Sequence, residues 1–336
     1  MPEGIMADTF TPDAFSLHTM TAAISAVPYK PGFVSRRGLF AEKGVTTNTV
    51  LIEERDGQLK LVQSSNREGP VTAQERKRRR IRSFVIPHLR EEDYAMASEV
   101  IGVRQFGTEG SLDTVENLRA ERSAVMAGNL DVTLEYHRVG AIQGVVLDAD
   151  GSVLFDLFDE FGVQQLPEVD FDLDNPNPVE GALLKKCNSV TRAIANELGA
   201  TELTGVESLC GDNFFDDLIT QKEVRDVYRY QEAARNAQGL VFNWVRYGDI
   251  TWINYRNAGF NMIGTDKCHL YPTGVPDLFI TRFGPANYIE TVNTVGLPRY
   301  AKGVVDQWGK RVDFEAQSNP LNLCTRPRTL VQGKRT

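Results

Sequence analysis

The sequence is poor in the residues that build most metal sites: its 336 residues include only four histidines and four cysteines. Zinc needs three or four ligands at close spacing. Cys268 and His269 are adjacent, but His18, His88 and His137 lie far away on other predicted elements. The cysteines form no Cys-x-x-Cys pair, and a chain of this size needs no disulfide staples. We therefore predict no metal site and expect buried thiols in a reducing cytoplasm.

Catalytic motifs are also missing. There is no Gly-x-Ser-x-Gly elbow, and the scarcity of histidine weakens a Ser-His-Asp arrangement. Residues 303–311 approach a phosphate-binding loop, but the spacing is one residue too long and Arg311 occupies the position of the required Ser or Thr. Carboxylates cluster at 156–160 and 212–217, yet nothing places a substrate between them. We predict a protein that is not an enzyme and holds no cofactor; an enzyme of unrecognised type would depend on the second cluster.

Long apolar runs are absent too, since none approaches the roughly 20 residues that span a bilayer. The N-terminal residues 1–8 lack the basic start and apolar stretch of a signal peptide. The net charge is -8 and the apolar fraction 41%, with a pI of about 5.2. These values are typical of a globular protein of one large or two medium domains without a membrane segment. They argue against a nucleic-acid-binding domain, which is normally basic.

The strongest local feature is the basic run at 76–82, Arg-Lys-Arg-Arg-Arg-Ile-Arg. Three interpretations are open: pairing with carboxylates of a neighbouring subunit, which planar guanidinium groups bind bidentately, a solvated basic face, or phosphate contacts to nucleic acid. Its length also fits a nuclear address. We favour pairing between subunits, with acidic segments 91–93, 156–160 and 168–174 as candidate partners. The candidate contact residues are Arg76, Arg78, Arg79, Arg80, Arg82, Glu91, Glu92 and Asp93.

The first third of the chain predicts few regular elements. Proline and glycine interrupt residues 1–45 too often for a long helix or strand, and either a disordered terminus or a docked arm would fit. The docked arm is favoured because aromatic residues such as Phe10, Phe15 and Phe33 are rare in linkers. Strands at 50–52 and 59–62 around an Asp-Gly turn then predict a hairpin. A two-stranded ribbon is marginal alone and needs a neighbour.

Residues 90–142 predict a helix in two pieces. Glu91-Glu92-Asp93 would open the first piece, where the helix dipole favours carboxylates, and Gly107 and Gly110 would end it. The second piece has Ser111 as a candidate cap and a possible bend at Gly128. Its apolar residues recur every seven positions and predict one buried face. They are Leu118, Val125, Val132 and Val139, with Val115 and Tyr136 on the same stripe.

The second half predicts more elements. A hairpin is expected at 144–157 around Asp150-Gly151, and another at 241–255 around Gly248-Asp249. Between them, 167–178 predicts a linker and domain boundary, and 177–199 a helix with an Asn177 cap. Its stripe is Val179, Leu183, Cys187, Val190, Ile194 and Leu198, which buries Cys187. A helical stretch is expected at 214–237 and strands at 277–283, 287–292 and 312–315.

This order of parts resembles the major capsid proteins of tailed phages, in particular the lambda head protein (capsid protein E) family. The segments that carry the resemblance are Arg78-Arg79-Arg80 before the long helix and residues 133–136, Thr-Leu-Glu-Tyr, near its end. The resemblance covers nearly the whole chain. It implies the α+β fold known from phage HK97, with an N-terminal arm, an extended hairpin loop, a spine helix, a peripheral domain and an axial domain.

The resemblance also implies a function and a domain plan. Copies would form hexamers and pentamers of an icosahedral head around double-stranded DNA, in the host cytoplasm during assembly and then in the virion. A separate scaffolding protein, a portal and optionally a decoration protein would be partners, with DNA nearby but no sequence-specific contact. The alternative function is nucleic-acid binding through 76–82. The implied domains are an arm at 1–43, an extended loop at 44–86, a peripheral domain at 87–175 and 300–336, and an axial domain at 176–299.

Overall fold

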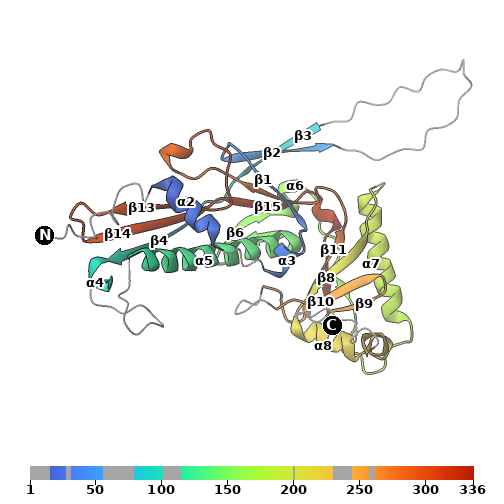
Figure 1. The fold of residues 1–336 in the computed structure, drawn as a ribbon. Helices are drawn as coiled ribbons and strands as arrows, with labels where there is room; N and C mark the ends of the chain where they lie inside the picture. Colours follow the sequence, from blue (N-terminus) through green and yellow to red (C-terminus); the bar gives the residue numbers. More distant parts are fainter. Residues whose placement is uncertain are drawn as a thin grey trace, which may run out of the picture. The chain divides into compact units, whose positions relative to one another are not determined.

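The computed structural model describes residues 16–27, 32–55, 79–100, 115–199, 201–229, 244–256 and 262–336. They form a mixed α+β fold (Figure 1) that divides into two compact units. The first unit comprises 1–50, 84–137 and 280–322, and the second comprises 51–83, 138–279 and 323–336. This division places 138–175 and 323–336 with the segment predicted as the axial domain. The predicted domain boundaries remain a proposal.

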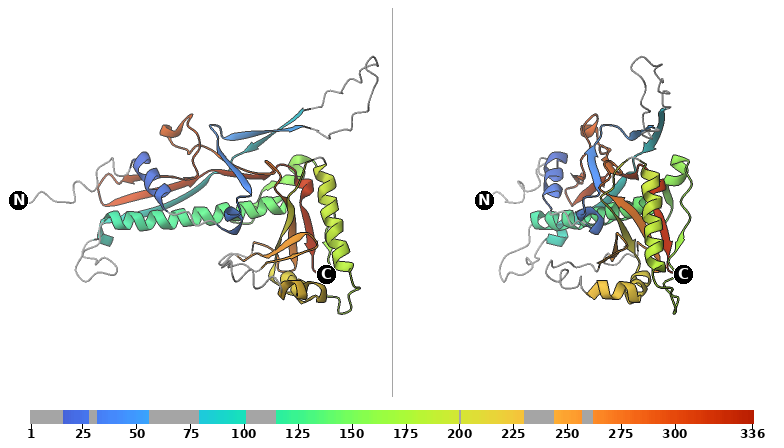
Figure 2. Two further views of the ribbon diagram at one scale, coloured as in Figure 1. Left: turned by 45° about the vertical axis from the view of Figure 1, so that its right-hand side comes forward. Right: turned by 90° about the vertical axis from the view of Figure 1, so that its right-hand side faces the viewer.

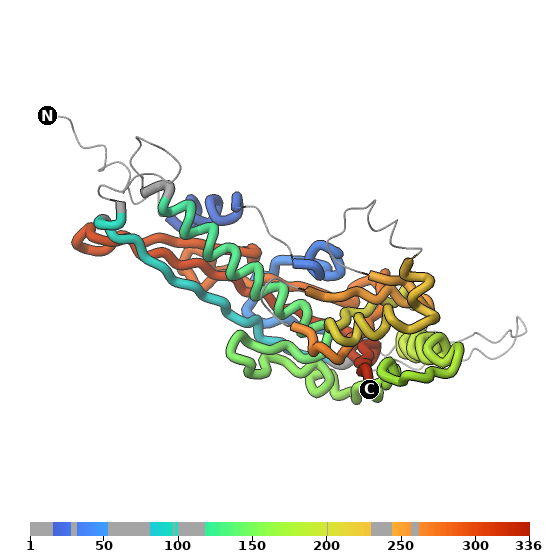
Figure 3. The backbone as a smooth tube through the Cα atoms, turned by 90° about the horizontal axis from the view of Figure 1, so that it is seen from below, coloured from blue at the N-terminus to red at the C-terminus, as the bar shows by residue number. Residues whose placement is uncertain are grey.

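The first unit is built on an antiparallel sheet of three strands in the order β13-β14-β4. Helices α2 and α5 pack on its inner face, and α5 runs along the strands (Figure 3). The core between them includes Met20, Ile24, Met126, Leu130 and Phe314. The elements are α2 (Leu17–Ala26), β4 (Leu89–Met96), α5 (Val115–Gln143), β13 (Tyr300–Val305) and β14 (Arg311–Ser318).

The predicted first helical piece at residue 90 is wrong, because these residues form strand β4. Exposed and less exposed side chains alternate along it, with the period of two that defines a half-buried strand. The three acidic residues favour the start of a helix, but this segment pairs with β14 over eight residue pairs instead. Only the short helix α4 (Ala97–Val100) follows, and Gly107, Gly110 and Ser111 lie outside the described residues.

The second piece is confirmed as α5, which continues through Gly128 without a break, so the suggested bend is absent (Figure 2). The predicted seven-residue stripe is only partly right. Val139 is buried, but Val125 is 54% exposed, and Met126, Leu130 and Leu134 are buried instead. A straight helix has 3.6 residues per turn, so the stripe that meets the sheet follows steps of four.

The N-terminal segment is more ordered than predicted. Helix α2 begins after Ser16, whose side chain accepts a hydrogen bond from the Thr19 amide. Met20 and Ile24, four residues apart, are fully buried against the sheet, which supports the docked arm. Helix α3 (Phe33–Arg36) and strand β1 (Phe40–Gly44) follow. Strand β1 joins β12 (Phe279–Phe283) and β15 (Pro320–Cys324) in a second three-stranded sheet, whereas Phe10 and Phe15 lie outside the described residues.

Strands β2 (Thr49–Arg55) and β3 (Arg79–Val85) form a separate two-stranded ribbon. Strand β2 therefore pairs with a strand well beyond its predicted partner. The predicted partner strand 59–62 and the Asp-Gly turn before it fall outside the described residues. The ribbon lies inside the predicted extended loop at 44–86.

The second unit contains a six-stranded sheet in the order β7-β16-β11-β8-β10-β9, with helices α7 and α8. Its core is aromatic: the Phe171 ring packs edge-on against both Phe214 and Trp252, at centroid distances of 5.6 and 5.2 Å. The elements are β7 (Val169–Asp170), α7 (Ala182–Leu198), β8 (Gly205–Cys210), α8 (Asp212–Thr220), β9 (Trp244–Tyr247), β10 (Ile250–Asn254), β11 (Lys267–Thr273) and β16 (Val331–Lys334).

Most predictions for this unit are confirmed. Strands β9 and β10 form the expected hairpin, whose turn residues Gly248 and Asp249 both have positive φ. Strands β5 (Val145–Leu147) and β6 (Val153–Asp156) form the other hairpin, followed by α6 (Leu157–Phe161). Helix α8 and a helix at 222–229 occupy the described part of the predicted 214–237 stretch.

Three details of the later elements differ from prediction. Helix α7 begins after Gly181, which has φ 76°, rather than after Asn177, and Val179 is 75% exposed. The predicted linker at 167–178 contributes Phe171 and Leu173 to the core. Residues 287–292 form no strand, and Ile289–Thr291 is a 3-10 turn instead. The stripe from Leu183 to Leu198 is buried as expected, including Cys187.

Candidate interaction surfaces

The β2–β3 ribbon exposes large apolar side chains. Along β3, Ile81 is 62% exposed and Val85 64%, whereas Phe84 on the opposite face is 1% exposed. On β2, Leu51 is 65% exposed. No third strand of the described chain joins this sheet. Exposed apolar groups gathered on an element with so few partners favour a surface that another molecule covers.

The basic run ends on this ribbon, and Arg82 is held within its own chain. Its Nη2 donates to the Phe161 carbonyl at 2.5 Å and its Nη1 to the Glu160 carbonyl, and its guanidinium lies over the Phe161 ring. These carbonyls close the end of α6, where a cation is favoured. Arg76 and Arg78 lie outside the described residues, and only the backbone of Arg79 and Arg80 is described. Their pairing with a neighbouring subunit remains a proposal.

Strand geometry separates the three acidic candidates. Glu91 and Asp93 lie on the inner face, where Glu91 accepts a hydrogen bond from Asn129 at 2.6 Å and Asp93 contacts Arg122 at 3.2 Å. Glu92 lies on the outer face. Sequence reasoning treated them as a single acidic group because it expected a helix. In the strand, Glu92 faces outward and pairs with Arg90 of its own chain.

The outer face of the β4–β14–β13 sheet is hollowed into a groove of about 590 Å³. Its charges are paired within the chain: Arg90 with Glu315 at 2.9 Å, and Arg311 with Asp313 at 3.1 Å. Burial tends to raise the pKa of Glu315, but hydrogen bonds from Gln317 and Tyr288 outweigh it and the pKa is lowered. This carboxylate therefore stays ionised, and it is already satisfied.

Apolar residues border the same groove. Tyr94, Asp313 and Val304 are directly opposite one another across the three strands. Tyr94 is 49% exposed and Val304 57%, and Trp308 at the β13–β14 turn is 79% exposed. Because the charges on this face are paired, these apolar side chains are the groups that would gain most from being covered.

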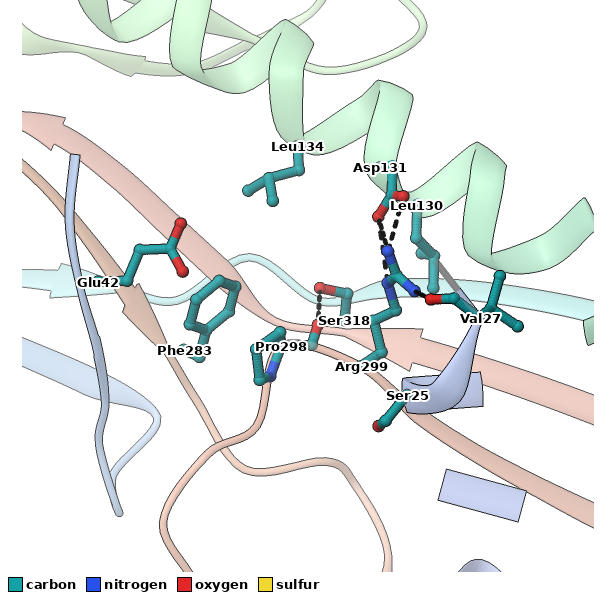
Figure 4. A pocket seen from close by; sticks show the side chains of 10 residues that line it. All are labelled: Ser25, Val27, Glu42, Leu130, Asp131, Leu134, Phe283, Pro298, Arg299 and Ser318. Carbon is teal, nitrogen blue, oxygen red and sulfur yellow. Dashed lines mark hydrogen bonds and ion pairs between the residues drawn. The ribbon is translucent and has the colours of Figure 1, made fainter. Parts of the chain in front are cut away.

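A buried ion pair joins three elements of the first unit. The Arg299 side chain reaches both carboxylate oxygens of Asp131 on α5, at 2.5 and 2.6 Å from Nη2 (Figure 4). Its Nη1 donates to the carbonyls of Ile24 and Val27 at the end of α2, at 3.3 and 3.4 Å. The pair borders a cavity of about 300 Å³. One guanidinium thus ties α2 to α5.

A second carboxylate of α5, one helical turn after Asp131, binds the N-terminal segment at α3. Glu135 accepts hydrogen bonds from the amides of Val34 and Ser35, at 2.7 and 3.1 Å. Gly32 must lack a side chain, because a Cβ there would lie 2.1 Å from the Glu135 Cδ. Sequence reasoning missed Asp131, Glu135 and Arg299. The available signal was the spacing of the two carboxylates, one helical turn apart beside apolar Leu130 and Leu134.

Other classes of site receive no support from the described part of the chain. No helix there is long and apolar enough to pass through a bilayer. Within the same residues, no three His, Cys, Asp or Glu side chains are grouped as metal ligands. Cys268 and His269, the adjacent pair noted in the sequence, lie on neighbouring positions of β11, so their side chains point to opposite faces of the sheet.

Comparison with known proteins assigns the fold and family. The model of the phage major capsid protein E family matches residues 16–335. Major capsid proteins of Salmonella phage Felix O1 and Pseudomonas phage KPP10 are each 26% identical to the chain; the matches cover 94% and 95% of this chain and 95% and 97% of those proteins.

Solved structures agree on the fold. A putative capsid protein of an Escherichia coli CFT073 prophage matches with a TM-score of 0.59 at 12% identity, covering 96% of this chain and 99% of that one. The cyanophage Pam1 capsid matches with a TM-score of 0.52 at 10% identity, covering 88% of each chain. The fold is therefore the HK97-like α+β fold. The chain belongs to the phage major capsid protein E family, a structural protein rather than an enzyme, and forms the icosahedral shell of a tailed-phage virion.

Proposed function

We propose that copies of this chain join as hexamers and pentamers, and that the β2–β3 ribbon of one copy covers the outer face of the β4–β14–β13 sheet of the next. The observation that carries this proposal is the exposed apolar set Leu51, Ile81 and Val85 on a ribbon of only two strands. Such a ribbon is marginal in water. It would gain most of its stability after docking.

The receiving surface is argued from its shape and its apolar border. The groove offers Tyr94 and Val304 to the ribbon, and its paired charges need no new partner. Burial of a few hundred Å² of apolar area contributes several kcal/mol at about 25 cal/mol per Å². Each contact is weak against the cost of association, but contacts repeated around a closed ring support one another.

The basic run would set the register of this contact. Arg76 and Arg78 precede β3, Arg79 and Arg80 are its first two residues, and Glu92 is the outward carboxylate of the predicted acidic trio. Ion pairs at a partly exposed interface contribute specificity and association rate more than affinity. We therefore assign the apolar face to affinity and the arginines to alignment.

Further partners follow as part of this proposal. A separate scaffolding protein and a portal would guide assembly, and a decoration protein is optional. Packaged DNA would lie near the shell without sequence-specific contact, in keeping with the net charge of -8.

The test is assembly of the purified chain, followed by electron microscopy and light scattering. The variant Leu51→Ser/Ile81→Ser should remain a folded subunit and lose shells and rings, because it removes only exposed apolar area. The matched control Val153→Ser/Val179→Ser changes residues that are 60% and 75% exposed elsewhere and should assemble normally. Normal shells from the ribbon variant would overturn the docking proposal.

A second set of variants tests the proposed arginine contacts by exchanging charges. Arg78→Glu/Arg80→Glu should assemble poorly, and adding Glu92→Arg should restore part of the yield if these residues face each other. Lys185→Glu/Arg192→Glu, on the exposed side of α7, changes the net charge by the same amount and is the control for it. Salt-dependent DNA binding by the wild-type subunit that the Arg78→Glu/Arg80→Glu variant loses would instead favour the nucleic-acid alternative.

A further inference from the structure

Two of the four cysteines face each other in the core of the second unit. Cys210 ends β8, and the antiparallel register places it directly opposite Cys268 on β11. Both are fully buried and belong to the same core. Directly opposed residues of an antiparallel pair have their side chains on the same face of the sheet, with Cβ atoms about 4.5–5.5 Å apart.

The backbone hydrogen bonds show which type of pair this is. The Cys210 carbonyl accepts from the Tyr255 amide at 3.0 Å, away from β11, and the neighbouring Gly211 amide donates to the Lys267 carbonyl at 2.9 Å. Cys210 and Cys268 therefore form a non-hydrogen-bonded pair, the type whose Cα atoms approach most closely, at about 4.5 Å. That separation lies within the range that a disulfide bridges, about 4.4–6.8 Å.

The local packing leaves space for the sulfur atoms. Gly333 lies opposite Cys268 on the other neighbouring strand, and a Cβ there would lie 2.6 Å from the Cys268 Sγ. The missing side chain therefore leaves room for the Cys268 sulfur, which interacts with the Cys210 thiol. Burial, and then the neighbouring Cys210 thiol, raises the pKa of Cys268, so the Cys268 thiol reacts slowly.

We propose that Cys210 and Cys268 are an oxidation site that closes as an intrachain disulfide between β8 and β11 once the shell has left the reducing cytoplasm. In this step the two S–H bonds break and one S–S bond forms. The two hydrogen atoms, with their two electrons, pass to dissolved dioxygen, which becomes hydrogen peroxide. Dioxygen is small and apolar enough to reach a buried pair.

Slow reaction suits this timing. The subunit would fold and assemble with both thiols reduced, and the bond would form during the longer life of the free virion, where disulfides persist. The bond would link two adjacent strands of the six-stranded sheet and restrict their separation. Cys187 lies on α7 and Cys324 on β15, and neither is a strand partner of Cys210 or Cys268.

The experiment compares the full chain, as subunit and as assembled shell, in air-saturated buffer with copper–phenanthroline and in anaerobic buffer with a phosphine reductant. Free thiols are then alkylated in denaturant and mapped by mass spectrometry. We expect the oxidised wild type to lose two of its four thiols and to yield one peptide pair linking Cys210 to Cys268. The reduced sample should retain all four.

Variants sharpen the result. Cys268→Ala should keep its three remaining thiols after oxidation, whereas Cys324→Ala should still lose two. Hydrogen exchange across β8 and β11 should slow in the oxidised wild type, which a bond elsewhere would not produce. Four free thiols after exposure to dioxygen, or a link between other cysteines, would overturn the proposal. Mapping of the wild type decides the question even where a variant fails to fold.

Discussion

The two units differ in the side chains that form their cores. The second unit buries a cluster of aromatic rings, Phe171, Phe214 and Trp252, within a six-stranded sheet and its helices. The first unit packs two helices on one face of a three-stranded sheet and joins them with buried charge, Asp131 and Arg299. The second core is built from packed apolar and aromatic side chains, whereas the first also contains a buried ion pair that orients its helices.

This difference has a consequence for assembly. A buried ion pair contributes less to net stability than apolar groups of equal volume, but it is strongly destabilising when one partner is lost. The pair of Asp131 and Arg299 therefore specifies how α2 lies on α5 more than it stabilises the unit. The first unit also carries the outer sheet face that we propose as the receiving surface, and that face must present one geometry to every neighbour.

The largest effect should come from the aromatic core. Trp252→Ala removes a fully buried ring and should lower the free energy of unfolding by about 3–5 kcal/mol. Urea titration of the unassembled subunit, followed by circular dichroism, measures it. Trp308→Ala is the matched control, because Trp308 is 79% exposed and should change stability by about 0.5 kcal/mol or less. Equal losses in the two variants would contradict the contrast between core and surface.

The buried ion pair comes next. Arg299→Met leaves Asp131 buried without its cation and should cost about 3 kcal/mol, and it should increase hydrogen exchange in α2. The double variant Asp131→Leu/Arg299→Met should cost less than the single one, since no charge remains unpaired. Glu197→Ala, which breaks the exposed pair with Arg328, should cost about 1 kcal/mol or less. A double variant as unstable as Arg299→Met would show that the loss comes from packing around these side chains and not from an unpaired charge.

Acid should weaken the second unit through His269 on β11. Burial, and then the charge of Lys267, lowers the pKa of His269 to about 4. The unfolded chain binds this proton near pH 6.5, so the stability that the neutral imidazole provides is complete above pH 6.5 and is lost as pH falls toward 4. Between pH 8 and pH 5 the loss should be about 2 kcal/mol. His269→Gln should remove this part of the pH dependence; an unchanged profile would assign it to other groups.

The sequence predicted elements where local chemistry and tertiary packing agree. The hairpins at Asp150-Gly151 and Gly248-Asp249 and the buried stripe of α7 follow from turn residues and helical spacing. Prediction failed where pairing with a distant strand decided the outcome. Residues 89–96 carry an acidic, helix-like pattern but pair with 311–318, more than 200 positions later. The receiving face and the Arg299 contacts likewise depend on segments brought together only by the fold.

The smallest effect tests the corrected stripe of α5. A seven-residue repeat predicts that Val125 is buried, yet it is 54% exposed, and its neighbour Met126 is 1% exposed. Val125→Ser should therefore change the free energy of unfolding by about 0.5 kcal/mol or less, whereas Met126→Ala should cost about 2–5 kcal/mol. Urea titration of both variants under one set of conditions gives the comparison. A large loss of stability in Val125→Ser would mean that the opposite side of α5 faces the sheet. The contacts of Asp131 with Arg299 and of Glu135 with the Val34 and Ser35 amides would then be wrong as well.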